Sequence, residues 1–303
     1  MVRHLGAVVL SWLCVTAVCF CAIHALPGDP VEIFLQHLNV AATPETVAAL
    51  RASWGLDRPL PVQFANWISS FLLGDWGVSF QTGADIAHDL GRRLPWSAAI
   101  GIGGLAIATV IGTVLGFRAA LHPGRACDTA TRFFAVAGQA LPAFAVGLVV
   151  LWLLAAELRL IRPFSGSAMT RLVLPIALVA FFSIGGISRL VRSGFVVVSR
   201  AAYFRTALAK GLSPATALWR HGRRHTGLVL LAGLAPELAW VVGGTAVAEI
   251  VFGVPGVSER VVQAVAARDY AVLQAYVALI AAWMLFVLKV AIWMGHHFDP
   301  RAV

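Results

Sequence analysis

Two carboxylates lie within a long apolar run, where a charge is costly and therefore informative. Glu237 and Glu249 both fall inside residues 227–252, a stretch that contains no other charged side chain. A carboxylate near the bilayer centre costs about 2.5–3.5 kcal/mol on insertion scales, so each should face protein or water. We expect both to line a translocation path. For Glu249, which lies near the end of its run, capping of nearby backbone or pairing with an arginine is the alternative.

Proline residues are the second feature of the apolar runs that could contribute to a translocation path. Pro142, Pro175 and Pro236 each interrupt such a run. A proline inside a membrane helix frees a backbone carbonyl that can line a cavity or allow bending. We expect Pro142 to contribute to the path, and kinks that serve packing alone are the alternative.

The residues with metal-binding or catalytic potential form no complete site. His221 and His225 are four residues apart on a predicted helix, but two histidines without a third ligand are weak evidence for a metal. The apolar runs hold no Ser/His pair, paired aspartates or His-Glu-x-x-His motif, and the chain has no Gly-x-x-x-x-Gly-Lys-Ser/Thr loop for a nucleotide. We therefore predict no catalytic residue, no metal and no cofactor bound by this chain.

The composition places these residues in a membrane. Of 303 residues, 59% are hydrophobic and only 12% are charged, which a water-soluble globule could not bury. The net charge of +9 is split among short loops between apolar runs, so it does not indicate nucleic-acid binding. The four cysteines show neither a disulfide framework nor metal-ligand spacing.

Six apolar runs are each about long enough to cross roughly 30 Å of hydrocarbon as a helix. The first is too long for the hydrophobic part of a secretory signal and lacks a good cleavage site, so we interpret it as a retained span. The runs cover residues 5–26, 97–117, 133–156, 172–188, 227–252 and 271–295.

The distribution of Lys and Arg predicts the orientation of these spans. Residues 189–226 contain eight basic and no acidic residues, whereas residues 27–96 contain seven acidic residues and four Arg. Because cytoplasmic loops are enriched in Lys and Arg, we place 189–226 and both termini in the cytoplasm and 27–96 in the periplasm. Within 27–96 we expect one helix from Thr43, its N-cap, to Trp54 and another from Val62 to Leu73.

The basic segment predicts two short helices with a tight turn between them. The expected helices are Ala201–Ala209 and Pro214–Arg224. Gly211 can adopt a positive φ, and Ser213 is a good N-cap before a proline at the first helical position. The segment then projects from the membrane as a knob; a solvated basic loop that only fixes topology is the alternative.

The basic segment contains the stretch Tyr203-Phe204-Arg205-Thr206-Ala207-Leu208-Ala209-Lys210-Gly211-Leu212-Ser213, followed by Arg220-His221. This sequence resembles the EAA loop of binding-protein-dependent ABC importer permeases, in the dipeptide, oligopeptide and nickel branch. Further stretches resemble the same branch in the same order along the chain: Leu26-Pro27-Gly28-Asp29-Pro30, Gly55-Leu56-Asp57-Arg58-Pro59, Gly74-Asp75-Trp76-Gly77-Val78-Ser79, Leu141-Pro142-Ala143-Phe144, Leu174-Pro175, Glu249-Ile250-Val251-Phe252, Pro255-Gly256-Val257, Arg268-Asp269-Tyr270 and Asp299-Pro300-Arg301.

The resemblance implies an all-α membrane protein with six transmembrane helices, in the type I ABC importer permease fold. Its first transmembrane helix would cover residues 1–26, and an extracytoplasmic insertion would follow over 27–96. Residues 97–303 would form a five-helix permease core that carries the cytoplasmic coupling loop at 189–226.

The resemblance also implies a mechanism for the chain and a set of partner proteins. The coupling loop would dock in a cytoplasmic ATPase through Tyr203, Arg205, Thr206, Ala209, Lys210, Gly211, Leu212, Arg220 and His221. Expected partners are a second homologous permease, two ATPase subunits that use ATP, and a periplasmic binding protein. The chain would be located in a bacterial inner membrane.

The expected cargo is a di- or oligopeptide, or a chelate of nickel or another metal, because the matching motifs do not select between them. An ion-coupled secondary transporter is the main alternative, although two intramembrane carboxylates are a thin basis for a proton relay. A membrane enzyme is a weaker alternative, because the apolar runs lack the catalytic residues that such an enzyme would need.

Overall fold

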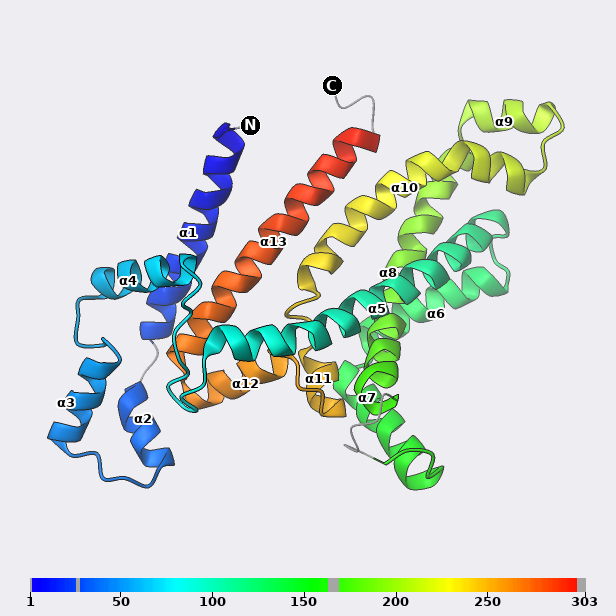
Figure 1. Cartoon of the computed structure of the whole chain (residues 1–303). Coiled ribbons are helices and arrows are strands. Elements are labelled where there is room, and N and C mark those ends of the chain that lie inside the picture. The colour runs from blue at the N-terminus through cyan, green and yellow to red at the C-terminus, as the bar shows by residue number, and fades with distance from the viewer. Residues whose placement is uncertain (1, 26–27, 163–168, 299–303) are drawn as a thin grey trace. The chain divides into compact units, whose positions relative to one another are not determined.

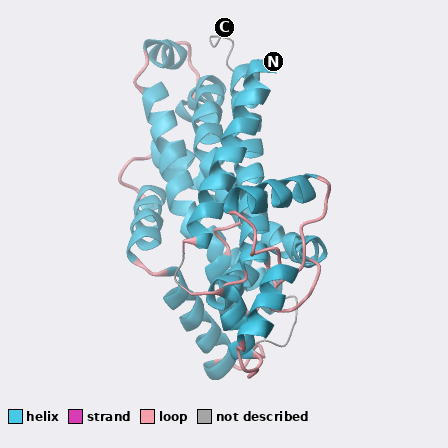
Figure 2. Cartoon of the chain, turned by 90° about the vertical axis from the view of Figure 1, so that its left-hand side faces the viewer, coloured by secondary structure: helices cyan, strands magenta, loops and turns pink. Residues whose placement is uncertain are grey.

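The computed structural model describes residues 2–25, 28–162 and 169–298, and this part of the chain consists of helices joined by loops (Figures 1 and 2). Its regular elements, apart from two five-residue π-helical turns, are thirteen α-helices. The motif residues Leu26-Pro27 and Asp299-Pro300-Arg301 lie outside the described residues. The helices divide into two compact units, one built from residues 1–95 and 255–285 and the other from 96–254 and 286–303.

The first unit contains the helices of the segment between the first two apolar runs. Its elements are α1 (Val2–His24), α2 (Pro30–His37), α3 (Pro44–Ser53), α4 (Leu60–Leu72), α12 (Val257–Ala267) and the beginnings of α5 (Ile86–Leu121) and α13 (Tyr270–Phe298). The predicted cap of α3 is confirmed, since the Thr43 side chain accepts a hydrogen bond from the Thr46 amide. A buried apolar cluster that includes Ile86, Leu90 and Val257 forms the core of this unit.

The second unit is centred on α8. Its elements are α6 (Ala126–Ala140), α7 (Ala143–Trp152), α8 (Leu174–Ser199), α9 (Ala202–Ala209), α10 (Pro214–Trp240), α11 (Ala246–Phe252) and the remainders of α5 and α13. Helix α8 packs against both α6 and α10. The contact with α6 depends on Gly185, because a methyl group built there would lie 2.5 Å from the carbonyl carbon of Phe134. Small residues allow this close approach of membrane helices.

Among the described residues, four helices are long and apolar enough to cross a membrane: Gly6–His24, Ile86–Leu121, Thr170–Ser199 and Tyr270–Gly295. The number rises to six if the bent pairs α6 with α7 and α11 with α12 each count as one broken span. The third predicted run is such a pair, because the chain bends by 101° after α6, where Pro142 precedes the first residue of α7. Pro175 lies in the first turn of α8 and does not interrupt it.

The fifth run was predicted as one span over 227–252, and that prediction is wrong. Helix α10 ends at Trp240, a turn follows over 241–245, and α11 begins at Ala246. Two consecutive glycines, Gly243 and Gly244, lie in this turn, and glycine is the poorest helix former after proline.

Three helices also extend beyond the predicted boundaries. Helix α5 begins at Ile86, eleven residues before the predicted 97, because the Asp85 side chain caps it by accepting a hydrogen bond from the His88 amide (2.7 Å). Helix α8 continues to Ser199, past the predicted end at 188. The predicted short helix Pro214–Arg224 is instead the first part of α10.

Candidate functional site

The turn between α9 and α10 has the backbone geometry that its sequence predicts. Gly211 adopts a φ of +83°, which confirms the expected left-handed conformation. Ser213 caps α10 by accepting a hydrogen bond from the Thr216 amide (3.3 Å), as predicted, and the Leu212 amide donates to the carbonyl of Ala207 (3.2 Å). The two helices are therefore held in a fixed relation by the turn itself. Figure 1 shows α9 lying beside the beginning of α10.

Apolar side chains anchor this helix pair to the second unit. Phe204 of α9 and Leu218 of α10 are buried in the same cluster as Phe195 and Val198 of α8. Trp219 adds contacts to aromatic rings, with its centroid 6.2 Å from that of Phe195. The pair is consequently an integral part of the unit, and this anchoring is what distinguishes it from a solvated loop.

The residues predicted to dock an ATPase share one surface region, formed by α9, the turn and the start of α10. All of them except Leu212, which is half-buried, are exposed: Tyr203, Arg205, Thr206, Ala209, Lys210, Gly211, Arg220 and His221. The rings of Tyr203 and His221 lie 6.1 Å apart, so residues from the two helices meet across the turn. An exposed, positively charged and rigid projection is suited to binding a partner protein.

Helix α10 connects this surface to a cavity inside the second unit. The helix has 27 residues, which corresponds to a length of about 40 Å at 1.5 Å per residue. Near its other end, Glu237 and Trp240 line a cavity of about 180 Å³ together with side chains from α5, α7, α8 and the following turn. The surface predicted to dock an ATPase and the cavity are therefore joined by a single continuous helix.

The structure separates the three predicted path residues. Glu237 is exposed and lines the cavity. Glu249 is fully buried, and its Oε1 accepts hydrogen bonds from Ser97 Oγ (2.7 Å) and Thr245 Oγ1 (2.5 Å). Pro142 lies at the bend before α7 and is not among the residues that line the cavity, although its neighbour Ala143 is.

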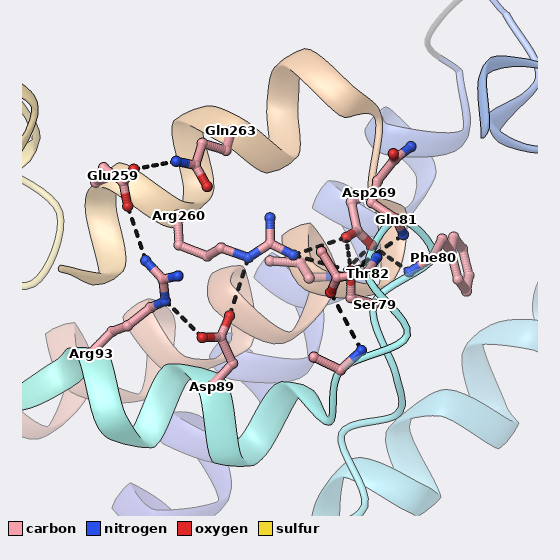
Figure 3. A network of polar contacts seen from close by, with 12 residues as sticks. Ser79, Phe80, Gln81, Thr82, Asp89, Arg93, Glu259, Arg260, Gln263 and Asp269 are labelled. Carbon is pink, nitrogen blue, oxygen red and sulfur yellow. Dashed lines mark hydrogen bonds and ion pairs between the residues drawn. The ribbon is translucent and has the colours of Figure 1, made fainter. Parts of the chain in front are cut away.

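A buried polar network in the first unit was not anticipated from the sequence (Figure 3). Arg260, which is 6% exposed at its side chain, pairs with fully buried Asp269 (Nη2 to Oδ2, 3.2 Å) and with Asp89 (Nε to Oδ2, 3.2 Å). Ser79 Oγ donates to Asp269 Oδ2 (2.5 Å) and accepts from Arg260 Nη2 (3.1 Å). The network ties residues 79–82 to α5 and α12, and Arg93 extends it by bridging Asp89 and Glu259 (2.7 and 2.9 Å).

A further buried carboxylate, Asp128, organises the end of α6 that is predicted to face the cytoplasm. Asp128 is 1% exposed at its side chain and forms ion pairs with Arg192 of α8 (2.9 Å) and Arg132 (2.9 Å). Its Oδ2 also accepts a hydrogen bond from the amide of Gly124 (2.9 Å). The only sequence signal for this site was an acidic residue among basic ones, four positions before Arg132.

Within the described residues, no group of three or more His, Cys, Asp and Glu side chains is arranged to hold a metal ion. His221 and His225 are both exposed on α10.

Comparisons with known proteins agree over both parts of the chain. Residues 112–303 match the family model described as binding-protein-dependent transport system inner membrane component, and residues 1–101 match the model for the N-terminal part of such membrane components. A probable peptide ABC transporter permease protein of Sinorhizobium fredii is 30% identical over 310 aligned residues, which cover 99% of this chain and 98% of that relative. The glutathione transport system permease protein GsiC is 29% identical in Salmonella typhimurium and 28% in Escherichia coli, in each case over 279 residues that cover 92% of this chain and 90% of the relative.

Proposed function

Since this chain belongs to the binding-protein-dependent transport system inner membrane component family, we propose that it moves peptides across the membrane through the cavity beside Glu237. The family assignment confirms the resemblance found in the coupling segment. It makes the chain a multi-pass inner-membrane permease of an ATP-driven importer, which works with an ATPase and a substrate-binding protein and is itself not an enzyme. The ion-coupled alternative is thereby set aside.

The observation that carries the proposal is the continuity of α10 from the coupling turn to the cavity. Helix α10 is unbroken from Pro214 to Trp240, and its interior proline, Pro236, which removes one backbone hydrogen bond, comes one residue before Glu237. A displacement of the turn at Gly211 would therefore be carried along α10 to the end that lines the cavity. Closure of the ATPases would move the α9–α10 pair, and α10 would reshape the cavity, which is an alternating-access cycle driven from the cytoplasm.

The same geometry supports a proposal for the finer composition of the transporter. Glu237 and Trp240 are exposed. Both lie in the last part of α10, which belongs to the apolar run 227–252 and is expected to be in the membrane. Such residues need protein or water opposite them, and a second, homologous permease would enclose the water-filled path that they face. Two permeases would present two coupling surfaces, so we propose two ATPase subunits that bind and hydrolyse ATP, while this chain binds no cofactor.

The orientation and cargo complete the proposal. The basic coupling surface would face the cytoplasm with both termini, and the acidic residues of 27–96 would meet a periplasmic binding protein. Peptide is the proposed cargo, because two of the relatives' names specify a peptide and the tripeptide glutathione. A nickel or other metal chelate is the competing cargo.

The experiment that tests the proposal is co-purification of the tagged chain expressed with its genomic neighbours, followed by ATPase assays. We expect an ATPase to co-purify, and we expect binding protein loaded with a peptide to stimulate ATP hydrolysis. Stimulation by nickel chelates but not by peptides would contradict the cargo, and purification of the chain alone would contradict the partners.

A further inference from the structure

The cavity at the end of α10 has a chemical character that the permease role alone does not explain. Its lining is mainly aliphatic and aromatic, and Glu237 is the one charged residue among the side chains that line it, all of which are in the described part of the chain. Ser183 and Thr245 contribute hydroxyl groups. None of the lining residues is Lys, Arg or His, so the cavity has a net negative charge when Glu237 is ionised.

An aromatic side chain lines the same cavity as this carboxylate. Trp240 follows Glu237 by three residues on α10, and residues three apart share a face of a helix. Both side chains line the cavity, and Trp240 is 63% exposed. A carboxylate and an indole ring that line one cavity can together attract an organic cation, because the ring can add a cation–π attraction to the ion pair.

Glu237 differs from Glu249 in being available to a ligand. Glu249 is fully buried and hydrogen-bonded to Ser97 and Thr245, whereas Glu237 is exposed. An ionised carboxylate in an apolar run is unfavourable unless water or a cation meets it. A passing cargo with a positive charge would satisfy that requirement.

We propose that Glu237 and Trp240 form a specificity site that binds the primary ammonium group of the cargo as it passes through the cavity. This proposal rests on the proposed function, since peptides carry such a group at the N-terminus and on lysine side chains. No bond is made or broken. The carboxylate pairs with the ammonium group, and the indole ring and neighbouring apolar side chains contact the adjoining carbon atoms.

The test is peptide uptake by the complete transporter in liposomes that contain ATP, with saturating loaded binding protein outside. We expect Glu237→Gln to lower uptake of a free-amine tripeptide about tenfold, equivalent to about 1.4 kcal/mol. Glu237→Asp, which retains the charge, should stay within about threefold of the wild type, or about 0.7 kcal/mol on the same scale. The matched control is Glu157→Gln, because Glu157 is also an exposed carboxylate of the second unit but does not line the cavity.

Three peptides then identify the group that is recognised: one with a free N-terminus, one acetylated with an amine only on a lysine side chain, and one without any amine. We expect Glu237→Gln to reduce uptake only of those with an amine, and the first two peptides distinguish the sources of the ammonium group. Equal losses for all three would indicate a structural ion pair with another subunit and overturn the proposal, as would unchanged uptake of all three. If the wild-type transporter takes up no peptide with ATP, the proposed function itself fails.

Discussion

At the residue scale, ion pairs of the first unit differ in how much solvent they exclude. Arg260 and Asp269 are 6% and 0% exposed at their side chains, whereas Arg51, which pairs with Asp29, is 47% exposed. Removal of one partner from a buried pair leaves an uncompensated charge away from water, which is strongly destabilising. An exposed pair contributes little, because water and salt screen it.

This contrast predicts the effect of two arginine substitutions on stability. We expect Arg260→Ala to lower the free energy of unfolding by about 3–5 kcal/mol, since Asp269 remains buried without its cation. Arg51→Ala, the control, should cost less than about 1 kcal/mol. Thermal unfolding of the two purified variants in detergent measures the difference. Equal unfolding midpoints would show that the Arg260 network does not stabilise the first unit.

Local residue chemistry was predictable from the sequence, whereas distant pairing was not. The caps by Thr43 and Ser213 and the positive φ of Gly211 follow from side-chain chemistry within a few residues. The hydrogen bond from Ser79 to Asp269 joins residues 190 positions apart. No local preference encodes such a contact, because it depends on how the helices pack.

At the element scale, our proposal requires the turn between α9 and α10 to pass its displacement on to α10. The sequence predicted the turn but ended its second helix at Arg224, because the basic residues stop there and the apolar run begins at residue 227. A change from polar to apolar residues marks a change of environment and does not end a helix. Gly227 alone is too weak a helix breaker, at about 1 kcal/mol, to stop α10.

The turn predicts a specific loss of coupling when Gly211 is replaced. Neither Gly211 nor Gly227 has an atom within 4 Å of an added Cβ, but only Gly211 has a positive φ, at +83°. We expect Gly211→Val to strain or reshape the turn at a cost of about 1–3 kcal/mol and to abolish most stimulation of ATP hydrolysis by loaded binding protein. Gly227→Val should retain it.

Both variants should insert and purify at wild-type levels, which separates coupling from folding. Stimulated ATPase activity of the assembled complex is the measurement. Retained stimulation in Gly211→Val would show that the conformation of this turn does not matter for coupling.

At the scale of the whole molecule, composition predicts the membrane but not the shapes of all its spans. Helices α1 and α13 follow their apolar runs closely, whereas the third and fifth runs are broken near Pro142 and within residues 241–245. Apolar residues indicate that a segment lies in the membrane, but they do not indicate whether its backbone continues or bends. The breaks adjoin the cavity, where Ala143, Gly244 and Thr245 contribute to the lining.

We propose that this chain forms the path of an importer driven by ATP that is hydrolysed on a partner subunit. The most direct test is to identify the energy source of transport. The measurement is peptide uptake into liposomes that contain the complete transporter, with ATP either enclosed or omitted and with ion gradients either imposed or collapsed by ionophores. We predict uptake that requires enclosed ATP and is unchanged when ion gradients collapse. Uptake driven by an ion gradient without ATP would contradict the account.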